Sequence, residues 1–129
     1  MNREIWEFLA GGSRQVMRTW IDKECISVRE RAKLDVSLER LRTLDFALVS
    51  KKLMAGPLRG TKVYKLRLRC ENRELRPMLC RGPVGSPLDY TLLEGAIEVG
   101  RQLRPPDAEQ RADENRVILI ERPQWREIY

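Results

Sequence analysis

Residues 62–70 alternate between apolar and cationic side chains, and this alternation restricts the fold more than any other pattern in the chain. The apolar set is Tyr64, Leu66, Leu68 and Cys70, and the cationic set is Lys65, Arg67 and Arg69. A period of two is typical of a β-strand with one face on the core. We therefore predict a strand over 62–70 with a cationic outer face, a turn at 71–73 and a partner strand over 74–81. Pro77 in the partner predicts an edge position or a bulge, because proline donates no backbone hydrogen bond.

The same part of the chain holds most of the positive charge. Residues 51–81 contain ten Lys or Arg and two acids, a net charge of +8, while the whole chain of 129 residues carries +6. The other residues therefore sum to −2. Cations fixed on a sheet favour a polyanionic partner, which is nucleic acid, an acidic protein surface or anionic lipid. Charge alone does not choose among these three.

The N-terminal half has the pattern of one strand followed by two helices. Residues 3–9 are rich in aromatic residues and end at two glycines, which predicts a strand. Ser13 is expected to cap a first helix that includes Trp20, and Ser27 and Glu30 have the spacing of a capping box at the start of a second helix. The apolar face of this second helix is marked by Leu34, Leu38, Leu41, Leu44 and Leu48.

The C-terminal half adds a third strand and a last helix. The apolar run over 90–99 predicts a central strand, and Pro105, Pro106 and the acids after them predict a helix start. Residues 117–120 fit that helix or a short strand, and residues 123–129 are interpreted as a C-terminal tail. We predict a single α+β domain over 1–129. It has a small antiparallel sheet of three to four strands, two N-terminal helices packed on it and a C-terminal helix.

Composition disfavours several classes of protein. No run of the sequence approaches the roughly 18 to 20 apolar residues of a membrane span, and the N-terminus does not resemble a signal peptide, so we expect a cytoplasmic protein without membrane contact. Cys25, Cys70 and Cys80 are odd in number and lack CxxC spacing, which favours reduced thiols over a disulfide framework or a zinc site. The sequence has no histidine. We expect no metal and no cofactor.

Three short motifs give the chain a resemblance to the RelE/HigB toxin superfamily, and more closely to its phage-derived branch. They are Val63-Tyr-Lys-Leu-Arg-Leu68, Arg76-Pro-Met-Leu79 and Leu92-Leu-Glu-Gly-Ala-Ile97, the last followed by Pro105-Pro106 and then by Ala112 and Arg116. The resemblance spans roughly residues 4–116. It implies a RelE-like fold and the toxin of a type II toxin-antitoxin system. Such a toxin cuts mRNA in the ribosomal A site, and an antitoxin, which we expect to be of the helix-turn-helix type, holds it inactive.

The resemblance also implies site residues. It places Arg67 and Arg76 at the family's strand arginines, but Glu94 stands at the position of the family's histidine, and Glu98 and Val99 replace its lysine pair. RNA cleavage without a metal needs a base, a phosphate clamp and an acid. The predicted catalytic residues are Arg67, Arg76 and Arg81 as the clamp and Glu94 as the base. Further acid or base candidates are Glu98, Lys62, Lys65, Tyr64, Tyr90 and Tyr129. The predicted RNA-binding residues are Lys62, Lys65, Arg69, Arg101 and Arg104.

Other interpretations of the same residues remain open. The arginine strand can be a solvated face, and Glu94 and Glu98 can be ion-pair partners of neighbouring arginines. Trp6 and Trp20 are expected in the core, while Trp125 to Tyr129 is either a packed tail or a segment that stacks on bases. The main function predicted is a metal-independent, ribosome-dependent mRNA endoribonuclease. The alternatives are a catalytically inactive module that binds RNA or protein, and a structural domain whose basic face binds an acidic protein segment.

Overall fold

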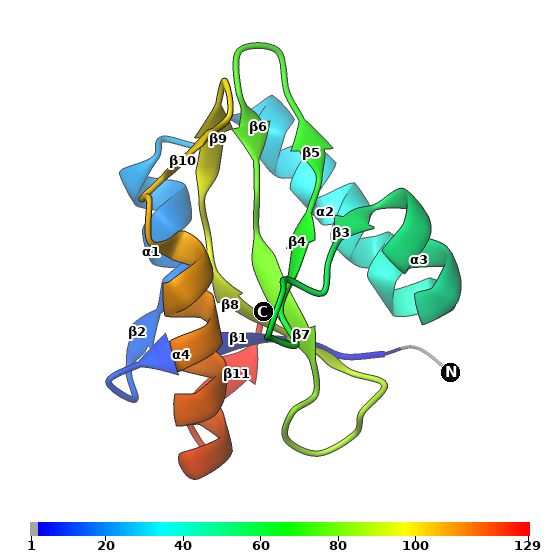
Figure 1. The fold of residues 1–129 in the computed structure, drawn as a ribbon, viewed down its shortest axis with the longest axis vertical. Coiled ribbons are helices and arrows are strands. Elements are labelled where there is room, and N and C mark those ends of the chain that lie inside the picture. The colour runs from blue at the N-terminus through cyan, green and yellow to red at the C-terminus, as the bar shows by residue number, and fades with distance from the viewer. Residues whose placement is uncertain (1–2) are drawn as a thin grey trace.

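The computed structural model describes residues 3–129, which form two sheets and four helices (Figure 1). The main sheet has the order β11-β1-β8-β7-β4-β3, with β2 paired to β1, and the smaller sheet has the order β10-β9-β6-β5. The main-sheet strands are β1 (Ile5–Ala10), β2 (Arg14–Gln15), β3 (Met54–Ala55), β4 (Tyr64–Leu66), β7 (Met78–Arg81), β8 (Tyr90–Glu94) and β11 (Arg126–Ile128). The smaller sheet contains β5 (Leu68–Arg69), β6 (Glu74–Leu75), β9 (Ile97–Val99) and β10 (Gln102–Arg104).

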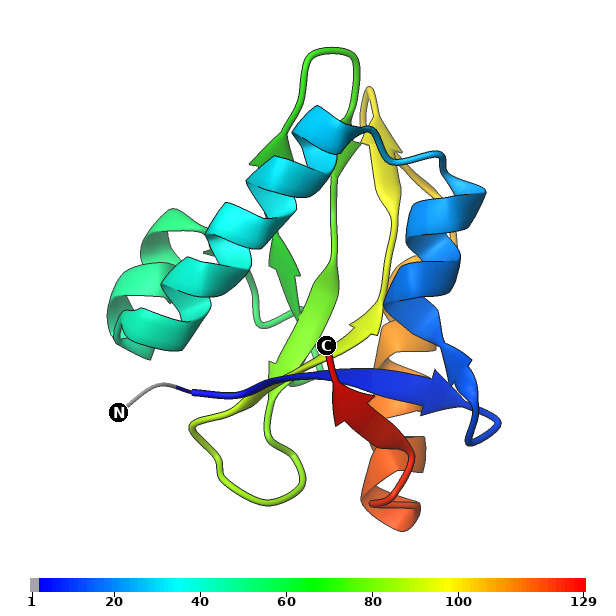
Figure 2. The same cartoon turned by 180° about the vertical axis from the view of Figure 1, so that it is seen from behind.

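The helices cover both faces of the main sheet. They are α1 (Val16–Lys23), α2 (Val28–Thr43), α3 (Phe46–Lys52) and α4 (Ala108–Glu121). Figure 1 shows α4 in front of the main sheet, and Figure 2 shows α1 and α2 on the opposite face. Side chains between these layers form the core, and the largest of them include Phe8, Met17 and Tyr90.

The α+β class is confirmed, but the sheet is larger than predicted and is not purely antiparallel. The central strand β8 pairs in parallel with β1, while its other neighbour, β7, is antiparallel to it. The strands β2, β3, β10 and β11 are short and polar or isolated from any alternating run. Their residues therefore give no period-two signal, and these strands form only through pairing with a neighbouring strand.

The predicted hairpin over 62–81 is present, and it is divided between the two sheets. Its β4 and β7 halves pair in the main sheet, and its β5 and β6 halves pair in the smaller one. Pro77 lies at the junction, where its carbonyl oxygen accepts a hydrogen bond from the Leu66 amide at 2.8 Å. An edge position for Pro77 is wrong because β7 lies between β4 and β8, and the irregularity expected as the alternative is observed instead.

Ser13 does not cap the first helix. Residues 14–15 pair with β1 as β2, so α1 begins only at Val16. The buried Glu7 side chain on β1 performs the capping, because its Oε1 accepts the amides of Met17 at 2.9 Å and Arg18 at 3.1 Å. A carboxylate brought from another strand thus satisfies exposed amides that a local hydroxyl usually satisfies.

The predicted second helix is two helices. The capping box is confirmed, since Ser27 Oγ accepts from the Glu30 amide at 3.1 Å and Glu30 Oε1 accepts from the Ser27 amide at 2.9 Å. The helix ends at Thr43, because Leu44 is extended with a ψ of 152°, and α3 then starts after Asp45. Leu48 belongs to α3 and is 41% exposed, so it does not extend the buried face of α2.

The C-terminal residues predicted as a tail are packed against the core, and they contain a strand that was not predicted. Residues 117–120 continue α4, which settles the choice between helix and strand. The chain then returns, and β11 runs antiparallel to β1 (Figure 2). Trp20 is in the core as predicted, whereas Trp6 is only half-buried and donates from Nε1 to Asp89 at 3.3 Å.

Candidate functional site

The four residues predicted to be catalytic lie in different surroundings. Arg76 is 8% exposed, and its guanidinium is bonded to the carboxylates of Glu74 and Glu98. The Arg67 Nη2 donates to the Met54 carbonyl at 2.7 Å, and the Arg81 guanidinium lies 4.3 Å from the centre of the Phe46 ring. Glu94 lies elsewhere, in a small pocket between α1 and α4. Among residues 3–129, no hydrogen bond or ion pair joins any two of these four.

Three of the five residues predicted to bind RNA are paired with acids. The ion pairs are Lys65 with Glu109 at 2.9 Å, Arg69 with Glu74 at 3.2 Å, and Arg104 with Glu24 at 2.8 Å. Lys62 and Arg101 are exposed in loops. The cationic face that the alternation predicted is therefore partly neutralised, because Lys65 pairs with Glu109 of α4 and Arg69 pairs with Glu74 of β6.

Positive charge gathers in a groove between α2 and the strand that runs from β4 into β5. The groove, called the cationic groove below, has a volume of about 370 Å³ and is lined by Ala32, Lys33, Val36, Ser37, Arg40, Leu53, Arg67, Leu68 and Arg69. Its charged residues are all cations, and no acid of the described chain lines it. Apolar side chains form part of the lining, so the groove offers both charge and a dry contact surface.

Local structure explains why these cations meet. Lys33, Val36 and Arg40 are spaced three and four residues apart, which places them on one side of α2 while Leu34, Leu38 and Leu41 on the other side are buried. Arg67 and Arg69 lie two residues apart on their strand, and both side chains are exposed. Lys33 Nζ donates to the Arg69 carbonyl at 2.6 Å and so links the helix to β5.

Sequence reasoning identified Arg67 and Arg69 but did not single out Lys33 or Arg40 as site residues. The signal that was present is the polar face of the second helix, which carries both of them. Only the packing of that helix beside the strand turns two separate cationic faces into one groove, and no periodicity in the sequence reports that packing.

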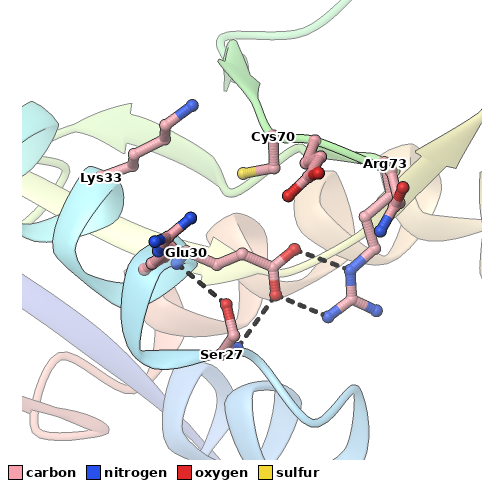
Figure 3. Close-up of a pocket in the computed structure, with 8 residues that line it drawn as sticks. Ser27, Glu30, Lys33, Cys70 and Arg73 are labelled. Atoms are coloured by element: carbon pink, nitrogen blue, oxygen red, sulfur yellow. Dashed lines mark hydrogen bonds and ion pairs between the residues drawn. The ribbon is translucent and has the colours of Figure 1, made fainter.

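A larger cleft, of about 530 Å³, adjoins the cationic groove at the start of α2 and shares Lys33 with it (Figure 3). Its centre is an ion pair in which Arg73 donates to both Glu30 oxygens, at 2.8 and 2.9 Å. This guanidinium lowers the pKa of Glu30 to about 2. Burial raises the pKa of the Cys70 thiol in the same cleft, so Cys70 is not an activated nucleophile. The charges of Glu30 and Arg73 at the centre of the cleft therefore compensate each other.

A third hollow continues the line at the other end of α2. It has a volume of about 300 Å³, shares Arg40 and Leu53 with the cationic groove, and is otherwise lined by Leu44, Leu48, Val49 and Lys52. The three hollows thus follow one side of α2, with compensated charge at one end, cations in the middle and an apolar surface at the other.

Glu94, the predicted base, is half-buried in a small pocket. Its pocket contains residues of α1 and α4 as well as Arg14. Burial raises the pKa of the Glu94 carboxyl, against the opposing effect of the Gly95 amide and of Arg111 and Arg14. A half-buried carboxyl with a raised pKa beside cations is the kind of group that is found at functional sites.

Neither a metal centre nor a membrane helix is found in residues 3–129. No group of three or more Cys, Asp or Glu side chains within this range is placed to hold a metal ion. No helix formed by these residues has the length and apolar character that crossing a bilayer requires. Comparison with protein-family models, with curated proteins and with solved structures finds no match to this chain.

Proposed function

We propose that the protein acts on RNA and holds a single strand of it in the cationic groove. The observation that carries the proposal is that four cations and no acid line this groove, whereas the larger cleft beside it contains the acids Glu30 and Glu71. One of the four cations, Arg69, is also paired with Glu74 at 3.2 Å. Guanidinium groups hold phosphate oxygens with two parallel hydrogen bonds, which suits Arg40 and Arg67 to phosphate contact. The apolar part of the lining offers contact surface to sugars and bases.

The resemblance to RelE/HigB toxins supports RNA as the polyanion and extends the proposal. The stronger version of the proposal is that the protein is a ribosome-dependent mRNA endoribonuclease toxin. The weaker version is that it is a catalytically inactive relative that only binds RNA. Arg76 is bound to two carboxylates and Arg81 is stacked on Phe46, so neither is free to clamp a phosphate without rearrangement. The geometry therefore favours RNA binding in the groove over cleavage by these arginines.

A second candidate is supported by the apolar hollow next to the groove. The hollow is lined by apolar side chains, which make no hydrogen bond to RNA phosphates, and by two cations. The apolar residues are Leu44, Leu48, Val49 and Leu53, and the cations are Arg40 and Lys52. An amphipathic acidic segment of an antitoxin fits this combination, because its apolar side chains would fill the hollow while its carboxylates meet the cations.

The test of the proposed function is charge reversal in the groove. The double variant Lys33→Glu and Arg40→Glu is expected to weaken binding of a single-stranded RNA oligomer more than tenfold in 0.1 M salt. It should also lower the salt slope of log K by about 1.4, since two phosphate contacts are lost at roughly 0.7 each. Fluorescence anisotropy over a salt series measures both quantities.

The matched control is Lys51→Glu with Arg59→Glu, which changes the net charge equally at exposed positions outside the groove. Equal losses in the two double variants would show that binding follows net charge and not the groove. An absence of RNA binding by the parent protein, together with tight binding of an acidic amphipathic peptide, would replace the first candidate by the second. Induced expression that arrests growth and yields cut mRNA supports the toxin form, and unaffected growth with intact mRNA contradicts it.

A further inference from the structure

One side of α4 exposes apolar side chains that do not contribute to the core. Val117 is 47% exposed and Ile120 is 49% exposed, and they lie three residues apart, so they are neighbours on the surface of the helix. The buried residues of α4 are Ala108, Ala112 and Leu119, which lie on the opposite side of the helix. The apolar pair therefore faces away from the core.

Three acids surround this apolar pair. Asp113, Glu114 and Glu121 each lie three or four residues from Val117, which places them on the same side of α4. None of these three acids takes part in an ion pair with another residue of the range 3–129. This surface is called the α4 face below, and it consists of Asp113, Glu114, Val117, Ile120 and Glu121. It has an apolar centre with unpaired negative charge around it.

The apolar hollow at the end of α2 has the complementary arrangement. Its apolar lining is Leu44, Leu48, Val49 and Leu53, and its cations are Arg40 and Lys52. Neither cation forms an ion pair within the described part of the chain. The volume of the hollow is about 300 Å³. Because one water takes up about 30 Å³ in the liquid, the hollow has room for more than one aliphatic side chain.

Exposed apolar side chains are concentrated at these two surfaces. Residues 3–129 expose eight large apolar side chains. Four of the eight are Val117 and Ile120 of the α4 face, Leu48 of the hollow and Val36 of the adjoining cationic groove. Exposed apolar surface with a polar rim is typical of protein–protein contacts. One chain thus presents an acidic and a cationic surface, each with an apolar centre.

We propose that the protein self-associates head to tail, with the α4 face of one copy seated on the apolar hollow of the next. Val117 and Ile120 enter the hollow, and the acids around them contact Arg40 and Lys52. The occupant is a second copy because the chain itself supplies both complementary surfaces. The α4 face and α2 lie on opposite faces of the main sheet (Figures 1 and 2), so two copies cannot make this contact twice at once. The contact is therefore heterologous, and it extends into chains or closes into a ring.

The contact is small, and its affinity is correspondingly low. Two aliphatic side chains with a few ion pairs bury less than the roughly 1,200 Å² of a stable interface, so a Kd on the order of 100 µM is expected. The net charge of +6 on each copy opposes association at low salt. About 0.15 M salt screens charges that are more than about 8 Å apart and weakens direct contacts less. Self-association is therefore expected at high protein concentration and moderate salt.

Self-association affects the cationic groove, because Arg40 and Leu53 line both the groove and the hollow. A copy docked on the hollow covers one end of the groove. Single-stranded RNA and the neighbouring copy are then expected to compete, so excess RNA oligomer should return the chains to monomers. This consequence rests on the proposed RNA binding, whereas the self-association itself does not.

The test is an exchange of charge between the two surfaces, followed by sedimentation velocity without RNA from about 10 to about 500 µM protein. Glu114→Lys with Glu121→Lys reverses the charge of the α4 face, and Arg40→Glu with Lys52→Glu reverses that of the hollow. The sedimentation coefficient of the parent should rise with concentration past that of a dimer, and each double variant alone should stay monomeric. An equimolar mixture of the two variants should associate again, because the new lysines of one then meet the new glutamates of the other.

All four substituted side chains are exposed, so both variants are expected to fold, which circular dichroism checks. The matched control is Asp22→Lys with Glu71→Lys, which changes the net charge as much as the α4 variant does, at exposed positions outside both surfaces. It should associate as the parent does. A mixture of the two variants that stays monomeric, or a parent that stops at a dimer, overturns the proposal. A monomeric parent at about 500 µM that binds an acidic amphipathic peptide also overturns it and assigns the hollow to a separate partner.

Discussion

Glu7 and Glu30 each accept backbone amides at a helix start, yet their surroundings move their pKa values in opposite directions. Glu7 is fully buried on β1, and burial raises the pKa of its carboxyl despite the amides of Arg18 and Met17. Glu30 is bound in a two-point contact by Arg73, whose charge and hydrogen bonds lower the pKa of Glu30 to about 2. A favourable partner outweighs partial desolvation at Glu30, and at Glu7 burial is the larger effect.

This difference predicts a pH dependence for Glu30→Gln. The folded pKa of Glu30 lies below its ordinary value of 4.5, so its stabilisation is present above pH 4.5 and is lost as the pH falls toward 2. The variant should lower the free energy of unfolding by about 1 to 3 kcal/mol at pH 7 and by much less at pH 2.5. Urea unfolding at a series of pH values measures this, with Glu121→Gln as the control. A deficit that does not change with pH would contradict the assigned ion pair.

At the scale of elements, one side of α2 packs into the core and another side lines the cationic groove. Leu34, Leu38 and Leu41 pack into the core, and the opposite side presents Lys33 and Arg40 to the cationic groove. Substitutions on the groove side are therefore expected to leave the packing of the core unchanged. The capping box at Ser27 and Glu30 fixes where the helix begins. It therefore also fixes which part of β5 Lys33 lies beside.

The strand β11 covers the outer edge of β1, and its removal is a second element-scale prediction. Truncation after Gln124 would leave β1 with unpaired backbone groups and would remove Trp125 from its contact with Gly12. We expect the free energy of unfolding to fall by about 2 to 4 kcal/mol, from roughly three lost backbone hydrogen bonds, and the protein to self-associate. Urea unfolding and sedimentation velocity test this.

The same truncation decides between structural and inhibitory roles of the C-terminal residues. Because β11 lies along β1 and does not line the cationic groove, RNA affinity of the folded truncated protein should match that of the parent. A marked gain in RNA affinity or in cleavage would show instead that residues 125–129 hold the protein in an inhibited form.

At the scale of the whole molecule, Cys80 reports on global unfolding. It lies in the central strand β7 and is fully buried, and burial raises the pKa of its thiol to about 12. Cys25 is exposed. At pH 8 we expect iodoacetamide to label Cys25 readily and Cys80 only through opening of the whole fold, as mass spectrometry of peptides over a urea series would show. Labelling of both thiols at equal rates in native buffer would contradict a closed core around β7.

Folding also changes which positive charges of the protein have an ion-pair partner. Residues 51–81 carry a net +8 as a sequence, but Lys65 and Arg73 pair with Glu109 and Glu30 from outside that stretch. Two of the four cations of the groove, Lys33 and Arg40, come from α2, which lies outside that stretch as well. A sum of charges over the sequence therefore does not show which cations meet in the groove.

Local patterns determined much of this protein before any tertiary information. The alternation at 62–70, the capping box at Ser27 and the prolines before α4 each follow from contacts within a few residues, so the sequence alone predicts them. The apolar run over 90–99 predicts one strand, but the structure divides it into β8 of the main sheet and β9 of the smaller sheet. Only the tertiary structure decided the end of α2 at Thr43, the pairing of β11 with β1 and the carboxylate cap from Glu7. It also decided that Lys33 and Arg40 meet Arg67 and Arg69 in one groove. Each of these depends on which distant surface a segment meets, and burial, ion pairing and pKa are properties of that meeting and not of the residue itself.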